Sequence, residues 1–148
     1  MRLTRLSLAA LTCTALACGD ETLAPTDPLG HYVLVEENGE APPTDPFRPD
    51  GCCLTLSLGL TFGSNTYDLH GFYRNKNSGL EFENLENGTF TRDGVTLHFT
   101  RTGGAGIGAP YLLAPGTMSD GSSTITLFYG DEGPGSNQIK GVFHRAES

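Results

Sequence analysis

Two adjacent cysteines, Cys52 and Cys53, are the residues of this 148-residue chain that suggest chemistry most directly. Their Cα atoms lie about 3.8 Å apart if the peptide between them is trans, whereas ordinary disulfides hold Cα atoms about 4.4–6.8 Å apart. In a β-strand their side chains also point to opposite faces. An ordinary bridge is therefore disfavoured. Three alternatives stay open: two separate thiols, pairing with another chain, or a strained vicinal disulfide as a candidate redox site in an oxidising compartment.

The four histidines show no spacing typical of a metal site. They are His31, His70, His98 and His144, and the chain contains neither a Cys-x-x-Cys nor a His-x-x-x-His pattern. His70 and His98 have polar neighbours. We expect surface histidines and no bound metal.

Three glutamates, Glu81, Glu83 and Glu86, are spaced so that two of them would supply a carboxylate pair, but only if their strand faces a cleft. We expect them to lie on an exposed face instead. The chain has no Gly-x-Ser-x-Gly, no Ser-x-x-Lys and no phosphate-binding lysine loop. We therefore expect neither an enzyme nor a cofactor.

A predicted β-hairpin lies at the centre of the chain. The runs Thr89–Thr91 and Val95–Thr100 alternate apolar and polar residues on either side of Arg92-Asp93-Gly94. Asp-Gly between such runs predicts a two-residue type I′ turn. The second run places Val95, Leu97 and Phe99 together on the face that we expect to be buried.

The clearest predicted strand is Cys53–Phe62. Five large apolar residues share one of its faces: Leu54, Leu56, Leu58, Leu60 and Phe62. At about 2 kcal/mol each, their burial contributes about 10 kcal/mol, which is comparable with the net stability of a domain. Tyr67, Leu69 and Tyr73 share a face of the next predicted strand, Thr66–Arg74.

Glycine and proline divide the chain into short strands. The 20 glycines and nine prolines lie between short apolar runs, and no window keeps helical periodicity for three turns. Eight or nine strands fit into residues 30–148. Such a sheet either closes on itself or folds into a sandwich, because an open one leaves two exposed edges, and we favour closure. The sequence predicts an all-β fold, an antiparallel meander of about eight strands that closes into a small barrel.

The N-terminus has the features of an export signal. Arg2 and Arg5 precede an apolar core, Leu6–Leu16, that is too short to span a bilayer. We therefore predict a signal peptide over residues 1–17, a polar tether over residues 18–29 and the folded domain over residues 30–148.

The end of this signal, Ala15-Leu16-Ala17-Cys18, resembles the bacterial lipobox, although its leucine stands one place later than in the usual pattern. The resemblance implies cleavage after Ala17, a diacylglycerol on the Cys18 thiol and a further acyl chain on the new amino terminus. Two or more chains anchor a protein stably. The alternative is an ordinary secretory signal that is cleaved nearby.

The start of the folded domain, Gly30-His31-Tyr32, together with the Asn38-Gly39 turn, resembles lipocalin-like (calycin) domains, whose first strand begins Gly-x-Trp or Gly-x-aromatic. It is also similar to small bacterial lipoproteins that follow a lipobox with a Gly-x-Tyr strand. The resemblance implies that Arg145 packs over Tyr32 as a barrel latch, a cation–π contact of about 0.5–2 kcal/mol. The alternative is that Arg145 is a solvated terminal charge.

The charge of the chain excludes some partners. The net charge is −8, and without residues 1–17 seven basic residues stand against seventeen acidic ones, a charge of about −10. Such a surface repels nucleic acid and other polyanions. Gly19 rather than Asp follows Cys18, so the inner-membrane retention signal of enteric bacteria is absent. We expect attachment to a membrane through the lipid on Cys18, at the outer membrane.

Two functions fit these observations. The first is a cell-envelope lipoprotein whose non-catalytic barrel holds one small apolar ligand. The candidate lining residues are Leu56, Leu58, Tyr67, Leu97 and Phe99. The second is a structural or protein-interaction lipoprotein with a filled barrel and no ligand.

Overall fold

The chain folds into a closed barrel of eight antiparallel β-strands, which confirms the predicted fold class. The computed structural model describes residues 27–46, 51–106, 115–129 and 138–147. The strands are β1 (Gly30–Glu37), β2 (Cys53–Phe62), β3 (Thr66–Asn75), β4 (Glu81–Asp93), β5 (Thr96–Gly106), β6 (Gly116–Ser119), β7 (Thr124–Tyr129) and β8 (Ile139–Arg145), with one 3-10 turn, η1 (Asp120–Ser122). Within the described ranges no helix is long and apolar enough to cross a membrane.

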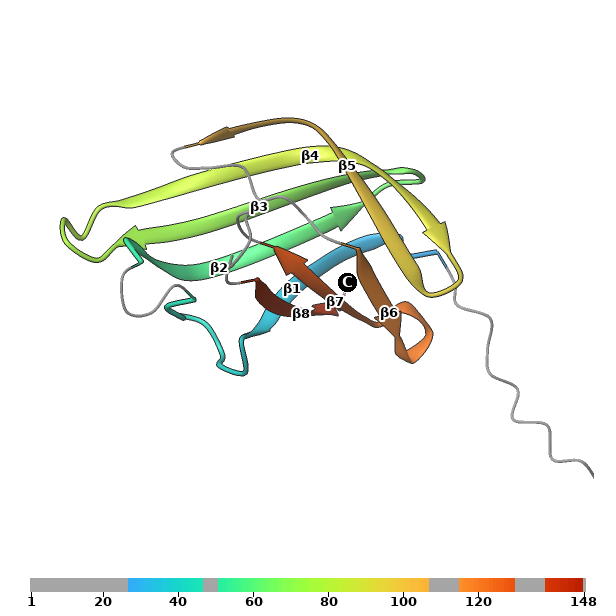
Figure 1. The fold of residues 1–148 in the computed structure, drawn as a ribbon, viewed down its shortest axis with the longest axis horizontal. Coiled ribbons are helices and arrows are strands. Elements are labelled where there is room, and N and C mark those ends of the chain that lie inside the picture. Colours follow the sequence, from blue (N-terminus) through green and yellow to red (C-terminus); the bar gives the residue numbers. More distant parts are fainter. Residues whose placement is uncertain (1–26, 47–50, 107–114, 130–137, 148) are drawn as a thin grey trace, which may run out of the picture.

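Each strand pairs with the next strand along the chain, and β8 closes the barrel by pairing with β1. Figure 1 shows the long strands β2 to β5 sweeping together across one side of the barrel, with the shorter β6, β7 and β8 on the other side. One end, which we call the latch end, is where β1 begins and where β2 and β8 end. The opposite end, where β1 ends and β2 begins, we call the loop end.

The core lies inside the barrel, and all eight strands contribute to it. Burial of these large apolar side chains drives closure, because a flat sheet would expose them. The buried hydrophobic residues are Tyr32, Leu34, Leu58, Leu60, Phe62, Tyr67, Leu69, Tyr73, Phe90, Leu97, Met118, Ile125, Leu127, Tyr129, Ile139 and Phe143.

Aromatic rings pack against one another towards the latch end. The Phe62 ring meets the Tyr32 ring edge-on at 5.6 Å between centroids and the Phe90 ring at 5.0 Å. The Phe99 ring meets the Tyr67 ring edge-on at 5.1 Å. These are favourable geometries for aromatic pairs, and they pack this half of the interior with rings.

A β-bulge corrects the prediction for the start of β2. The predicted alternation holds for Leu58, Leu60 and Phe62, which are buried. Between Thr55 and Ser57 the pairing with β3 shifts register, and a bulge reverses which residues face inward. Thr55 is therefore buried, while Leu56 is only half-buried. Leu56 was predicted to face inward with the other leucines, but at the bulge it is only half-buried.

The central hairpin also differs from the prediction. Asp93 pairs with Thr96, so the two turn residues are Gly94 and Val95 rather than Asp93 and Gly94. Gly94 has φ of 58°, and positive φ at the first turn residue alone fits a type II′ turn. Val95, which was predicted to face inward, is 48% exposed in the turn. Asn87-Gly88, a residue pair typical of tight turns, lies inside the continuous strand β4.

The predicted signal peptide and Cys18 lie outside the described residues. Residues 27–29 of the predicted tether are described, and they contact the barrel near the latch end. The Asp27 carboxylate lies 3.2 Å from the Arg92 guanidinium, and Pro28 is buried. The tether therefore joins the barrel at the latch end, where β1 begins.

Candidate functional site

The side chain of Glu86 lies inside the barrel, and the prediction of an exposed Glu86 was wrong. It is 3% exposed, because even-numbered residues in this part of β4 face inward. Glu81 and Glu83 face outward as predicted. Glu81 accepts a hydrogen bond of 2.6 Å from Arg74, and Glu83 lies 3.1 Å from the His70 ring.

Two inward-facing neighbours contact Glu86, and together the three residues form what we call the Glu86 cluster: Tyr67, Glu86 and Arg101. The Tyr67 hydroxyl donates a hydrogen bond of 2.8 Å to Glu86 Oε1. Arg101 Nε lies 3.7 Å from Glu86 Oε2, which is too long for a hydrogen bond. Within the described part of the chain, Oε2 accepts no hydrogen bond. The barrel interior thus contains a buried acceptor atom that lacks a donor.

The register of β3, β4 and β5 brings the cluster together. Gly88 on β4 pairs with Tyr67 on β3 and with Arg101 on β5. A Cβ atom at Gly88 would lie 2.6 Å from Tyr67 Cε1 and 2.2 Å from the Thr100 carbonyl oxygen. Glycine at this position therefore lets the tyrosine ring lie against the strand, next to Glu86.

Burial changes the ionisation of both acidic groups in the cluster. Desolvation raises the pKa of the Glu86 carboxyl, while the Tyr67 hydrogen bond and the positive charge of Arg101 oppose that change. Desolvation, together with the hydrogen bond to Glu86, raises the pKa of the Tyr67 hydroxyl far above its ordinary value. Glu86 therefore holds its proton to a higher pH than an exposed glutamate does.

The inner surface near the cluster is partly open to solvent. Phe82 and Asn84 lie on the same face of β4 as Glu86, and both are half-buried. Phe82 stacks on Tyr73 with 5.5 Å between the ring centroids. Phe99 on β5 is also half-buried, although it packs against the core. The inward-facing rings of Phe82 and Phe99 are thus less enclosed than those of Tyr32, Phe62 and Phe90.

The predicted lining residues take different places. Leu58, Tyr67 and Leu97 are fully part of the buried core, and Phe99 packs against its edge. Leu56 is half-buried at the bulge of β2. Tyr67 alone among the five belongs to the Glu86 cluster. Whether these residues line a ligand cavity stays a prediction.

The two residues named for the latch are in contact at the latch end. Arg145 lies over the Tyr32 ring, with 5.4 Å from Cζ to the ring centroid. Arg145 Nη2 donates a hydrogen bond of 2.8 Å to the Tyr32 hydroxyl, and that hydroxyl donates one of 2.7 Å to the Ser122 carbonyl oxygen. The contact therefore ties together β8, β1 and η1, which are distant in sequence.

A second buried carboxylate, Glu37, was missed by the sequence analysis. It is 2% exposed because the pairing of β1 with β8 shifts register between Leu34 and Glu36. Tyr129 and Thr44 donate hydrogen bonds from their hydroxyls to its two oxygens. Thr44 belongs to the β1–β2 connection, so Glu37 fastens that connection to the loop end. The sequence holds no signal for this role, because a bulge reverses the face on which Glu37 lies.

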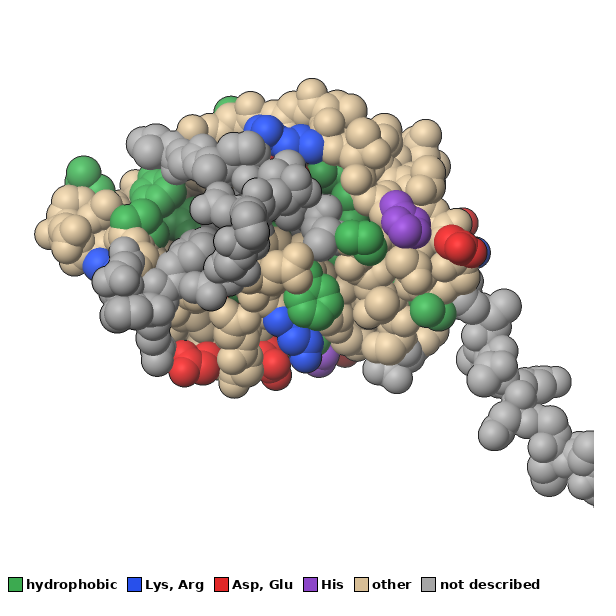
Figure 2. Space-filling model, in the orientation of Figure 1, with side chains coloured by type: hydrophobic (Ala, Val, Ile, Leu, Met, Phe, Trp, Pro, Cys, Tyr) green, Lys and Arg blue, Asp and Glu red, His purple; other side chains and the backbone are tan. Residues whose placement is uncertain are grey.

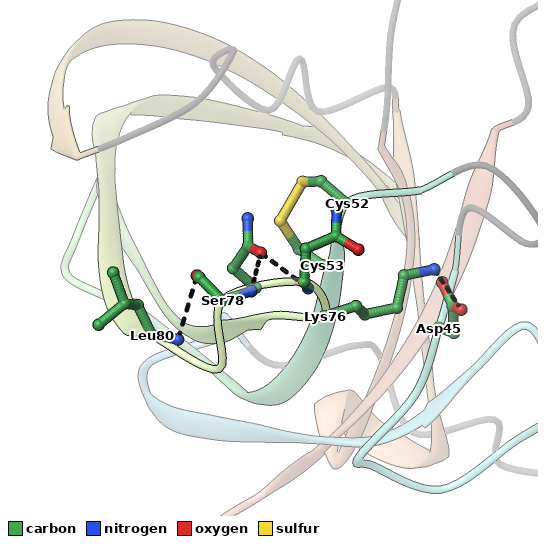
Figure 3. Close-up of a disulfide and its surroundings, with 8 residues drawn as sticks. Asp45, Cys52, Cys53, Lys76, Ser78 and Leu80 are labelled. Atoms are coloured by element: carbon green, nitrogen blue, oxygen red, sulfur yellow. Dashed lines mark hydrogen bonds and ion pairs between the residues drawn. A yellow bond between two sulfur atoms is a disulfide. The ribbon is translucent and has the colours of Figure 1, made fainter.

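Cys52 and Cys53 form a vicinal disulfide, with 3.7 Å between their Cα atoms. Of the three alternatives that the sequence left open, the structure shows the vicinal disulfide and not two separate thiols. The bridge lies at the loop end, where the β1–β2 connection enters β2. Figure 3 shows it beside the turn that carries Lys76 and Ser78, with the Lys76 side chain extended towards Asp45.

On the face of the molecule in Figure 2, the visible charged side chains of the described residues lie singly or in small groups among polar and hydrophobic surface.

Comparison with protein-family models, with curated proteins and with solved structures finds no match to this chain.

Proposed function

We propose that this chain is a lipid-anchored protein of the bacterial cell envelope whose non-catalytic barrel binds one small, largely apolar ligand. The ligand carries a hydrogen-bond donor that is directed at Glu86. Its apolar part lies against the half-buried ring of Phe82, which is on the same face of β4 as Glu86. A mainly apolar interior with few polar groups that orient the ligand is typical of small-molecule sites.

The observation that carries this proposal is that the buried Glu86 Oε2 accepts no hydrogen bond from the described residues. A buried acceptor that lacks a donor costs about 1–3 kcal/mol, and most buried polar atoms in proteins have a partner. Tyr67 bonds to the other oxygen, while Arg101 Nε makes an ion pair with Oε2 at 3.7 Å but lies too far away for a hydrogen bond. A ligand hydroxyl or amine that donates to Oε2 removes this cost and gains affinity from it.

The proposed anchor fits the arrangement of the barrel. The tether joins at the latch end, where Asp27 pairs with Arg92. The half-buried Phe82 lies near the start of β4, at the opposite end. A barrel held by lipid on Cys18 therefore has its tether at one end and its proposed ligand entrance towards the other.

The test is to extract the full-length protein from membranes in mild detergent and to measure co-purifying small molecules by native mass spectrometry. Glu86→Leu removes the acceptor, and Glu83→Leu is its matched control because Glu83 faces outward on the same strand. We expect a bound molecule in the wild type and in Glu83→Leu. In Glu86→Leu its affinity falls about 5- to 150-fold, which corresponds to about 1–3 kcal/mol.

A negative result is equally informative. If nothing co-purifies and a neutral apolar dye shows no saturable binding to the folded wild type, the barrel is filled and the ligand proposal is wrong. Equal retention by Glu86→Leu and the wild type would instead reject the role of Glu86 while leaving a ligand site in place.

The second candidate is a protein-interaction module that acts through the outside of the barrel. Phe72 on β3 is 40% exposed and Leu85 on β4 is 43% exposed. Both face outward, on paired strands. Surface hydrophobic residues that lie together mark interaction sites more often than isolated ones do. This candidate is favoured if Phe72→Ser abolishes capture of an envelope protein by in-cell crosslinking while no ligand is found.

A further inference from the structure

The disulfide between Cys52 and Cys53 does not staple the barrel. A disulfide stabilises a fold mainly by closing a loop of the unfolded chain, and the effect grows with the length of that loop. Adjacent residues close no such loop, and this bridge joins no two strands. Its value to the protein must therefore lie in its local chemistry rather than in the stability of the fold.

The position of the bridge exposes it to solvent. Cys52 is exposed and Cys53 is half-buried at the first position of β2. The Cys52 carbonyl oxygen accepts a hydrogen bond of 2.8 Å from the backbone N–H of Lys76. Lys76 Nζ lies 2.8 Å from Asp45 on the β1–β2 connection. The bridge thus lies at the loop end, between two connections that meet there (Figure 3).

We propose that Cys52–Cys53 is a reversible redox site that exchanges with thiol reductants from solvent. Exposed disulfides are the labile ones, whereas structural disulfides resist reduction by glutathione. Adjacency also holds the two Cα atoms closer than the range of ordinary disulfides, and such deviations make the bond more reducible.

The exchange is balanced in two steps. A thiolate of the reductant attacks the Sγ of Cys52, the more exposed residue of the pair, the Sγ–Sγ bond breaks, and the sulfur of Cys53 leaves as a thiolate that takes up a proton. A second thiolate then attacks the reductant sulfur of the mixed disulfide and releases the Cys52 thiolate, which is also protonated. Two electrons pass from two reductant thiols to the protein, and the reductant becomes a disulfide.

Reduction also changes the backbone at the loop end. Once the bond is broken, the side chains of adjacent residues are free to point to opposite sides of an extended chain. The disulfide and the peptide between the two cysteines together form a small ring, and reduction opens it. The hydrogen bond from the Lys76 N–H to the Cys52 carbonyl oxygen is then the first contact to loosen. Faster hydrogen exchange at that amide is therefore the expected local signature of the reduced form.

The experiment uses the full-length protein, isolated without reductant and kept folded. It is equilibrated with mixtures of reduced and oxidised glutathione, quenched with acid and alkylated with N-ethylmaleimide. The mass of the proteolytic fragment that contains both cysteines is then measured. We expect no adduct at the start, two adducts after reduction, and none again after oxidised glutathione is added. The double variant Cys52→Ser/Cys53→Ser, the matched control, should show no adduct on that fragment and a Tm within about 3 °C of the wild type, because no loop is opened.

Several results would overturn the proposal. These are resistance to glutathione until the protein is unfolded, thiols that never reoxidise, and a large loss of Tm on reduction or in the double variant, which would show a structural staple. None of these readings involves the proposed ligand. The redox proposal is therefore tested independently of the proposed ligand binding, and the failure of one does not imply the failure of the other.

Discussion

The contact between Tyr32 and Arg145 allows a quantitative test of how the barrel is closed. Tyr32→Phe removes one hydroxyl that donates to the Ser122 carbonyl oxygen at 2.7 Å and accepts from Arg145 at 2.8 Å. A net hydrogen bond contributes about 0.5–1.5 kcal/mol, and one to a charged group about 1.5–3 kcal/mol. Arg145 is exposed and regains water when the hydroxyl is lost, so the lower part of that range applies to it. We expect a loss of about 2 kcal/mol.

Arg145→Met keeps most of the alkyl chain and removes the guanidinium. It should cost about 1–2 kcal/mol, from the hydrogen bond to Tyr32 and an exposed cation–π contact of about 0.5–1 kcal/mol. Because the two residues share this interaction, the double variant should lose less than the sum of the single losses. The expected coupling is about 1 kcal/mol.

The assay is urea unfolding of the wild type, the two single variants and the double variant, followed by tyrosine fluorescence and circular dichroism. Arg74→Met serves as the control, because Arg74 makes an exposed ion pair with Glu81 and such pairs contribute about 0–1 kcal/mol. The reasoning is refuted if the coupling between Tyr32 and Arg145 lies within about 0.3 kcal/mol of zero. Arg145 would then be the solvated terminal charge that the sequence left as the alternative.

Three further outcomes are expected. Cys18→Ser should move the protein from the membrane fraction to the soluble fraction and remove the acyl mass; retention in the membrane would contradict the lipid anchor. Because burial raises the pKa of Glu86, its contribution to stability is complete below the ordinary glutamate pKa and is lost as pH rises through the raised value. In urea titrations the free energy of unfolding of Glu86→Gln minus that of the wild type should therefore increase as pH rises from the ordinary glutamate pKa through the raised one, and a difference that does not change with pH would contradict this. Gly88→Ala should cost about 2 kcal/mol or more, because its Cβ would lie 2.2 Å from the Thr100 carbonyl oxygen; unchanged thermal stability would argue against this packing.

The sequence alone was sufficient to predict the class of fold. Alternation in Leu58, Leu60 and Phe62 reports which side of a strand is buried, and it depends only on the period of two along an extended chain. Asp93-Gly94 predicted a tight hairpin. The structure has a tight hairpin there, but its two turn residues are Gly94 and Val95, one residue later than predicted. Closure was favoured over a sandwich because it removes the two edges that an open sheet of many short strands leaves exposed.

Tertiary structure alone decided which residues meet inside the barrel. Bulges in β1 and β2 turned Glu37 and Thr55 inward, and a bulge depends on pairing with another strand rather than on the strand's own pattern. Glu86 meets Tyr67 and Arg101 because of the register of three strands, which local spacing does not reveal. Alternation along one strand is a local property of the backbone, whereas contacts across strands depend on long-range pairing. For that reason the sequence by itself determined the all-β barrel, while the Glu86 cluster appeared only once the strands were in register.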